Sequence, residues 1–316
     1  MRVFAPGGIG NIGPGLDILG CAVTGAGDSV VASRIDAPGI RLDDPGHPDL
    51  PRDPERHTSA IAARDVLRRA NAEDVGIALT VEKGLPLCGG QGGSSASGVA
   101  GAVAANALLG NPLGWRDLLG AALHAEERVA GRHIDNLAPC LLGGILLIRS
   151  TDSFDLVRLP VPASLRIALV HPNQQLRTAE ARTVLPNSVD RALALAQASA
   201  VAGMVAAFCT GDLSLLRTAV DDRIAEPARA PMLPGFIEAK RAAMDAGALG
   251  CSISGAGPTS FAFAASDDDA RRVAEVMCRA YEQHGVAAAA RVARIDEQGA
   301  RVVQSDVTTR RVNAAQ

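Results

Sequence analysis

The stretch from Pro86 to Ser97 has the residue types that a phosphate-binding loop needs. It reads PLCGGQGGSSAS, with four glycines and three serines, and it follows an alternating run over Ile77 to Glu82. A long run of small, helix-compatible residues comes next and ends near Gly110. Backbone N–H groups at a glycine turn before a helix can surround an anion, and the helix N-terminus adds partial positive charge. The spacing alone also fits a tight surface turn that leads into a small-residue packing helix.

Glu126 is a second residue whose position suggests chemistry. The segment that begins near Trp115 has helical periodicity and one apolar face. That face is made by Leu118, Leu119, Ala122, Leu123, Val129 and Ala130. Glu126 projects into the middle of this stripe, where a carboxylate is unfavourable unless a cation or a donor meets it. It is therefore either a metal ligand or one half of a buried ion pair, and the sequence leaves both open.

Polar side chains gather at two further places. Asn11 and Asp17 lie in the glycine-rich segment GGIGNIGPGLDILG, where they can make directed hydrogen bonds or simply stabilise a turn. His133, Asp135 and Asn136 lie between the helix that carries Glu126 and an apolar run that reads as a buried strand. At such a junction they could hold a substrate or cap chain ends.

Composition excludes several classes of protein. With 316 residues and 47% hydrophobic content, the chain is long enough for a sizeable core and two domains. The net charge of −3 without a long single-sign run argues against nucleic acid or an anionic membrane surface as a partner. Six scattered cysteines without a C-x-x-C pair suit a reducing cytosol. We find no signal-peptide core and no apolar run long enough to span a bilayer, and therefore expect a cytoplasmic protein.

The elements that must position these residues alternate between strands and helices. Strands are predicted at 2–5, 28–35, 77–82, 141–148, 165–171 and 286–295. Helices are predicted at 58–71, from the glycine loop to 110, from 115, and at 189–209, 213–224, 235–247 and 267–284. Residues 36–57 read as a loop, and the polar, proline-containing stretch 150–164 as the domain change. The pattern favours an α+β sandwich with helices on one face.

Together these features resemble the GHMP kinase superfamily, and within it the homoserine kinases. The three glycine-rich stretches GGIGNIGPGLDILG, PLCGGQGGSSAS and GCSISGAGPTSFAFA resemble its three motifs in order. Further support comes from the segments at 11–17, 133–139, 178–182 with 185–186, and 226–229 with 234–235. The similarity runs from about residue 3 to residue 303.

The resemblance implies both a fold and a reaction. It implies an α+β GHMP kinase fold with an N-terminal ribosomal-S5-like, nucleotide-binding domain over 1–160 and a C-terminal ferredoxin-like α/β sandwich over 161–303. Residues 304–316 are expected to be a frayed tail. The active site would lie between the domains and transfer the γ-phosphoryl group of ATP to the side-chain hydroxyl of L-homoserine, in threonine biosynthesis. The cofactors implied are ATP and Mg²⁺, and the implied assembly is a homodimer.

The resemblance also implies site residues by position. The ATP phosphates would lie on the nucleotide loop, made of Pro86, Leu87, Cys88, Gly89, Gly90, Gln91, Gly92, Gly93, Ser94, Ser95 and Ala96. Ser94 and Glu126 would contact Mg²⁺. The acceptor pocket would be lined by Asn11, Asp17, His133, Asn136, Thr178, Arg182, Arg229 and Gly255. Asp17 would face the substrate ammonium, while Arg182 and Arg229 would grip its carboxylate, a task suited to the guanidinium fork. Asp135 is the candidate general base, with a structural cap beside His133 as its alternative.

Four departures from the family pattern concern the geometry around ATP. Glycines and one isoleucine fill positions 7–10, where small hydroxylated residues are usual, and Leu16 stands where an aromatic is usual. Gly93 replaces one of two loop serines, and Gln91 replaces an apolar residue. Three alternatives remain: a kinase for another small carboxylate-bearing alcohol, a non-catalytic ligand-binding descendant, and a Rossmann dehydrogenase. A Rossmann dehydrogenase needs an acidic residue for the ribose at the end of the strand that follows its glycine loop, and this chain has none there.

Overall fold

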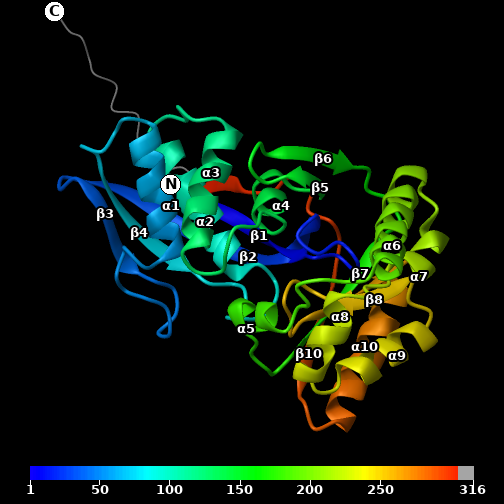
Figure 1. Cartoon of the computed structure of the whole chain (residues 1–316). Helices are drawn as coiled ribbons and strands as arrows, with labels where there is room; N and C mark the ends of the chain where they lie inside the picture. Colours follow the sequence, from blue (N-terminus) through cyan, green and yellow to red (C-terminus); the bar gives the residue numbers. More distant parts are fainter. Residues whose placement is uncertain (305–316) are drawn as a thin grey trace, which may run out of the picture.

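The computed structural model describes residues 1–304, so the predicted tail lies outside the described residues except for Gln304. Two β-sheets with helices packed on them organise the chain (Figure 1). This arrangement confirms the predicted α+β class. The first sheet contains β1 (Arg2–Gly10), β2 (Leu19–Ile35), β3 (Gly39–Asp44), β4 (Gly76–Glu82), β5 (Ile145–Ser150), β6 (Asp155–Leu159) and β11 (Arg301–Gln304). Its order is β11-β1-β2-β4-β3, and β5 joins the sheet by pairing with β2 and β6.

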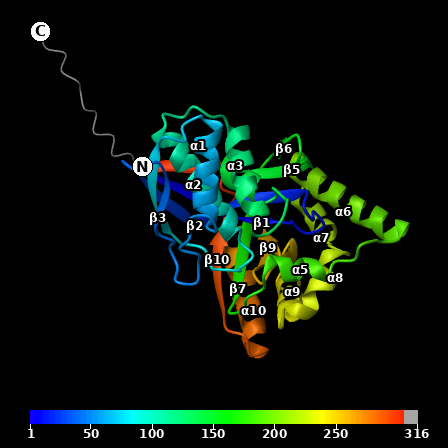
Figure 2. The ribbon, with the colours of Figure 1, turned by 60° about the vertical axis from the view of Figure 1, so that its left-hand side comes forward.

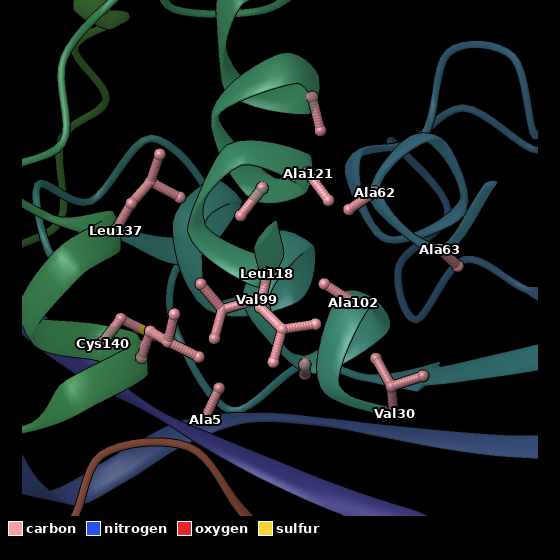
Figure 3. Close-up of a cluster of buried hydrophobic side chains, with 14 of the residues drawn as sticks. Ala5, Val30, Ala62, Ala63, Val99, Ala102, Leu118, Ala121, Leu137 and Cys140 are labelled. Carbon is pink, nitrogen blue, oxygen red and sulfur yellow. The ribbon is translucent and has the colours of Figure 1, made fainter. Parts of the chain in front are cut away.

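Four helices cover one face of the first sheet. They are α1 (Thr58–Arg69), α2 (Gly93–Leu108), α3 (Trp115–Glu127) and α4 (Leu137–Leu142). Figure 3 shows small side chains such as Ala62, Ala102 and Ala121 where these helices meet, above Ala5 and Val30 of the sheet. Side chains without bulk let helix axes approach closely at interior packing density. The helix that follows the glycine loop is therefore held rigidly.

The second sheet is antiparallel and has the order β10-β7-β9-β8. Its strands are β7 (Arg166–Pro172), β8 (Gly250–Ile253), β9 (Ser260–Ala264) and β10 (Ala288–Ala293). Helix α9 (Phe236–Asp245) precedes β8, and α10 (Asp267–Gln283) links β9 to β10. A β-α-β-β-α-β series in this order is the ferredoxin-like arrangement, as predicted. Alternation along β7 sends Ala168 and Val170 toward α9 and α10. Ile167 and Leu169 instead join the core with β1 and β2.

Short helices and one long helix connect the two sheets. They are α5 (Thr178–Thr183), α6 (Arg191–Thr210), the 3₁₀ turn η1 (Leu213–Leu215), α7 (Leu216–Ala219), α8 (Ala225–Arg229) and the 3₁₀ turn η2 (Ala230–Met232). Helix α6 lies at the periphery in both views (Figures 1 and 2). Within residues 1–304, α6 is the one helix whose length and composition would let it cross a membrane. The sequence analysis had found no such run.

The glycine-rich start of the chain is strand rather than turn. Strand β1 continues to Gly10 and pairs with β2 as far as Gly20, because glycines make no side-chain clash and their backbones can enter the ladder. The turn is confined to the segment between Gly10 and Leu19. A second correction concerns 141–148, where α4 ends at Leu142 and the strand begins only at Ile145.

Several other predicted elements also differ from the structure. The predicted loop 36–57 contains β3, which pairs in parallel with β4 alone and therefore forms an edge of the sheet. The predicted helix 213–224 is broken into η1 and α7, and β6 was not predicted. Residues 301–304, placed in the C-terminal domain and the tail, pair with β1 as β11. The guanidinium of Arg301 lies 4.8 Å above the ring of Phe4 at this pairing, a contact that no local pattern reveals.

Candidate active site

A cleft of about 770 Å³ lies between the two sheets and collects most of the predicted site residues. Its walls come from α2 and α3 on one side and from α5 and α8 on the other. The predicted residues that line it are Asn11, Pro86, Leu87, Cys88, Gly89, Gly90, Gly92, Gly93, Ser94, Ser95, Glu126, His133, Asp135, Asn136, Thr178, Arg182, Arg229 and Gly255. Residues far apart in the sequence therefore converge on one space.

The glycine loop is shaped as an anion cradle. Gly90 and Gly92 have φ values of +74° and +69°, a region that side chains disfavour. A Cβ on Gly90 would also lie 2.5 Å from the carbonyl oxygen of Ser254, so glycine is required there. Helix α2 begins at Gly93 without a side-chain cap, which leaves the N–H groups of its first turn free for a ligand.

The third glycine-rich motif holds this loop from the other domain. Ser254 Oγ donates to the Gly90 carbonyl oxygen at 2.7 Å, and Thr259 N donates to Gly89 O at 3.2 Å. Gly255 N donates to Gly10 O at 2.9 Å on the same side. The second and third glycine-rich motifs are thus in direct contact.

Ser94 and Glu126 meet at the mouth of the cradle. Ser94 Oγ donates to Glu126 Oε1 at 3.0 Å, and Glu126 is 3% exposed. Burial raises the pKa of the Glu126 carboxyl, against the opposing effects of His133 and Ser94. No lysine or arginine of residues 1–304 forms an ion pair with Glu126, so the structure does not support the ion-pair alternative. No group of three or more His, Cys, Asp or Glu side chains suited to a metal occurs in the same range.

Asp135 lies deeper, between the first turn and His133. Its Oδ2 accepts from the backbone N–H of Asn11 at 2.9 Å, and its Oδ1 lies 3.5 Å from His133 Nδ1. Burial raises the pKa of Asp135, with His133 acting in the opposite direction. His133 Nε2 donates to the Ala130 carbonyl at 3.2 Å, while His133 Nδ1 and Asn136 Oδ1 have no hydrogen-bond partner. These two free atoms are available to a ligand.

Gly10 explains one departure from the family pattern. A Cβ at this position would lie 2.2 Å from Asp135 Oδ2 and 2.3 Å from Asn136 Nδ2. No side chain fits there while the segment 133–136 packs against β1. Glycine at this point therefore lets two pocket residues reach the cleft.

An ion pair joins helix α5 to the first turn, the segment between β1 and β2. Arg182 Nη2 donates to Asp17 Oδ1 at 2.6 Å. Burial disfavours the charged Arg182, but its bond to Asp17 outweighs this and raises its pKa. The Asn11 side chain accepts from Asp17 N at 2.8 Å, so it stabilises the turn, as the plainer interpretation expected. Asp17 itself does not line the cleft, unlike its partner Arg182.

Arg229 is a buried cation without a carboxylate. It is 2% exposed, and it donates only to backbone oxygens, Ala181 O at 3.2 Å and Gly255 O at 3.1 Å. Burial and the nearby Arg182 lower its pKa. Within residues 1–304 it forms no ion pair, so its charge is available to an anionic group in the cleft.

Two residues predicted to bind ATP do not line the cleft. Ala96 is fully buried. The side chain of Gln91 is buried and donates to Thr259 Oγ1 at 3.2 Å, while its Oε1 accepts from Arg291 Nη2 at 3.0 Å. Gln91 thus ties the loop to the second sheet. This contact explains why a polar residue replaces the usual apolar one.

Lys83 and Asp28 are the supporting residues that the sequence analysis missed. Asp28 is fully buried and accepts from Lys83 Nζ, from Ser97 Oγ at 2.7 Å and from the backbone N–H of Gly84 at 3.1 Å. Lys83 Nζ also donates to Gly93 O at 3.0 Å. The pair anchors both ends of the loop. Lys83 directly follows β4 and lies just before the glycine-rich loop, and this position was the signal that could have identified it.

One further group of residues that line the cleft was also not predicted. It consists of Asp49, Leu50, Pro51, Arg56, His57 and Thr58. All of them except Thr58, the first residue of α1, belong to the segment 36–57, which was predicted only as a loop.

Comparison with known proteins agrees with this geometry. Residues 57–144 match the GHMP kinases N terminal domain, and residues 204–283 match GHMP kinases C terminal. The homoserine kinase of Chlorobium phaeobacteroides (strain BS1) is 40% identical over 292 residues, 88% of this chain and 91% of that protein. That of Arabidopsis thaliana is 39% identical over 96% of this chain and 85% of its own length. The chain belongs to the homoserine kinase family.

Solved structures place the family within a wider fold. The crystal structure of homoserine kinase from Cytophaga hutchinsonii has a TM-score of 0.92 and 40% identity, covering 96% of this chain and 97% of that one. Lactococcus lactis galactokinase has a TM-score of 0.72 at 16% identity, over 95% of this chain and 94% of its own. At that identity the likeness concerns the fold alone. The predicted GHMP kinase fold is confirmed.

Proposed function

We infer that this chain transfers the γ-phosphoryl group of ATP to the hydroxyl of L-homoserine and forms O-phospho-L-homoserine for threonine biosynthesis. Membership of the family supports the reaction. The assignment of the acceptor rests on Arg229, a buried guanidinium in the cleft without a counter-ion. A buried charge needs a partner, and a carboxylate matches the guanidinium fork. A neutral sugar would leave Arg229 uncompensated.

The amino group of the acceptor has a partner beside this cation. Asp17 is bonded to Arg182, which lines the cleft with Arg229. An α-amino acid carries an ammonium and a carboxylate on one carbon. It can therefore take its ammonium to Asp17 and its carboxylate to the two arginines. The side-chain hydroxyl then extends toward His133 and Asn136, whose free atoms can position it.

The glycine loop is proposed to hold the triphosphate. The uncapped start of α2 offers N–H groups and partial positive charge to the phosphate oxygens. Phosphoryl transfer depends mainly on positioning and on neutralising spread-out charge, so such a cradle lowers the barrier directly.

Ser94 and Glu126 fit a Mg²⁺ ion that reaches the site with ATP. Glu126 is buried, lacks an ion-pair partner in the described residues, and lies beside the loop. Mg²⁺ usually keeps several waters and takes one or two carboxylates plus substrate phosphates, so three protein ligands are not needed. When bound, the ion would neutralise phosphate charge. Ser94 would orient Glu126 through its 3.0 Å hydrogen bond.

Asp135 has two possible roles. Burial raises its pKa, which is the direction that favours a carboxylate as a base. One of its oxygens, however, already accepts from Asn11 N, and the other lies 3.5 Å from His133 Nδ1. These contacts favour a structural role, and we propose that Asp135 orients His133 and the first turn.

The cytoplasm suits an ATP-dependent enzyme whose six cysteines are all unpaired.

A coupled assay of ADP release tests the proposal against the alternatives. The acceptors are L-homoserine, L-threonine, mevalonate and galactose, each with MgATP. We expect saturable ADP release with L-homoserine. Turnover with a different carboxylate-bearing alcohol in its place would support the alternative acceptor. The absence of ADP release with any amino acid would overturn the assignment and favour a non-catalytic protein.

A further inference from the structure

Asp222 is a buried carboxylate that no cation neutralises. It is 7% exposed and forms no ion pair within residues 1–304. A buried charge costs free energy unless hydrogen bonds or an opposite charge compensate it. Arg229, the buried cation of the cleft, also lacks an ion pair and is the last residue of α8. Asp222 precedes the same helix, so two buried, unpaired charges of opposite sign flank one short helix.

Backbone N–H groups at the start of α8 hold the Asp222 side chain. Its Oδ1 accepts from Ile224 N at 3.0 Å and from Ala225 N at 2.9 Å, and its Oδ2 accepts from Glu226 N at 2.9 Å. The N–H groups of a first helical turn have no partner within the helix, and a carboxylate placed before the helix can satisfy them. Asp222 therefore fixes where α8 begins.

Gln197 connects Asp222 to the first turn. Its Nε2 donates to Pro14 O and to Asp222 Oδ1, both at 2.9 Å, and its Oε1 accepts from Arg223 N at 3.0 Å. The side chain belongs to the buried face of α6, so these bonds form away from solvent. One amide group thus ties the first turn to the segment that leads into α8.

Charge as well as contact links Asp222 to Arg229. Burial lowers the pKa of the Arg229 guanidinium, and the neighbouring Arg182 lowers it further. Asp222 acts in the opposite direction, and its effect is larger than that of Asp17 or Asp135. Loss of the Asp222 charge would therefore leave a buried cation with less compensation beside a second cation.

We propose that Asp222 is a positioning residue that acts through Arg229. It fixes the start of α8, and its negative charge stabilises the Arg229 guanidinium in the cleft. The guanidinium itself donates only to two backbone oxygens, Ala181 O and Gly255 O, so its place depends on where α8 lies. This role rests on the proposed function, in which Arg229 binds the acceptor carboxylate.

The kinetics of Asp222→Asn test this role. The change removes the charge and keeps Oδ1, which accepts three of the four hydrogen bonds. We expect KM for L-homoserine to rise about tenfold and KM for ATP to change by less than about twofold. In an Arg229→Met background the same substitution should cause no further rise. Equal rises in both backgrounds would overturn the proposal.

Asp221→Asn is the matched control for these measurements. Asp221 is the adjacent residue, its side chain is 42% exposed, and it pairs with Arg223 on the surface. Because this carboxylate compensates no buried charge, we expect both KM values to stay as in the unmodified protein. A rise in KM for L-homoserine as large as that of Asp222→Asn would also overturn the proposal.

Urea unfolding measures the same coupling without an acceptor. Asp222→Asn should lower the urea midpoint of the unmodified protein more than that of Arg229→Met, which has no buried cation for Asp222 to stabilise. Arg229→Gln repeats the comparison with a second uncharged side chain, should Arg229→Met not fold. If Asp222 only caps α8, the two losses will be equal and the proposal fails. Lack of ADP release by the unmodified protein with L-homoserine would instead refute the proposed function, and the urea comparison would still decide the role of Asp222.

Discussion

Arg182 and Asp17 form a two-point ion pair across the cleft wall, although 165 residues separate them in the sequence. Arg182 Nη2 lies 2.6 Å from Asp17 Oδ1, and Arg182 Nη1 lies 3.2 Å from Asp17 Oδ2. Both side chains remain partly exposed, at 30% and 40%. A zwitterionic acceptor could replace this ion pair with two new ones, one between its carboxylate and Arg182 and one between its ammonium and Asp17. In the proposed function, these are the two charges that the carboxylate and the ammonium of the acceptor would meet.

Replacement of Arg182 should affect the acceptor far more than the nucleotide. For Arg182→Lys we expect kcat/KM for L-homoserine to fall about 30-fold, the equivalent of about 2 kcal/mol for a lost charge-assisted hydrogen bond. The KM for ATP should change by less than about twofold, because Arg182 bonds to Asp17 and to no residue of the glycine loop. Arg223→Lys is the control, since Arg223 pairs with Asp221 on the surface. Equal changes in both KM values would remove Arg182 from the acceptor pocket.

Glu126→Gln should impair the use of Mg²⁺. The change keeps the shape of the side chain and a hydrogen bond to Ser94 but removes the charge. We expect kcat at saturating ATP to fall about 100-fold, and the Mg²⁺ concentration for half-maximal rate to rise. Glu127→Gln is the matched control, because Glu127 is the neighbouring, more exposed residue that pairs with Arg132. If both variants titrate with Mg²⁺ alike, Glu126 is no metal ligand.

The same substitution should stabilise the protein in the absence of ligands. Burial raises the pKa of Glu126 above its usual 4.5. A raised pKa means that the protonated carboxyl favours folding at low pH and that this contribution is lost as pH rises through the folded-state pKa. The Tm advantage of Glu126→Gln over the unmodified protein should therefore be small near pH 5 and larger at pH 8, by about 2 °C per kcal/mol recovered. A pH-independent difference would contradict the buried-charge account.

Gln91→Leu tests the contact between the loop and the second sheet. The family-typical leucine would leave Thr259 Oγ1 and Arg291 without one partner each. We expect a loss of about 1–3 kcal/mol in the free energy of unfolding, measured by urea denaturation. The KM for ATP should stay nearly unchanged, because the Gln91 side chain does not line the cleft. A large rise in that KM with unchanged stability would show that Gln91 touches the nucleotide after all.

The sequence predicted the features that depend on local patterns and on motifs. The strand, glycine loop and helix around Gly93 and the inward direction of Glu126 follow from spacing and periodicity. The proposed acceptor residues came from resemblance, and all of them except Asp17 line one cleft. The contact between the second and third glycine motifs, in contrast, appears only in the structure.

What escaped prediction depends on contacts between distant segments. Asp28 is one acidic residue in the interior of β2, and only its bonds to Lys83 and Ser97 show that it anchors the loop. β11 is recognisable only through its pairing with β1. The sequence indicated a turn at Gly10, because the lack of room for a side chain beside Asp135 arises only from the tertiary structure. Such features arise after folding brings the segments together.

The most direct test of the central claim is ³¹P NMR of a reaction that contains the full chain, MgATP and L-homoserine. We predict a new phosphomonoester resonance that matches O-phospho-L-homoserine and grows in step with ADP. Arg229→Ala under the same conditions should give little of this signal at low L-homoserine and recover part of it at high concentration. Release of inorganic phosphate alone, or no change in ATP, would contradict the account.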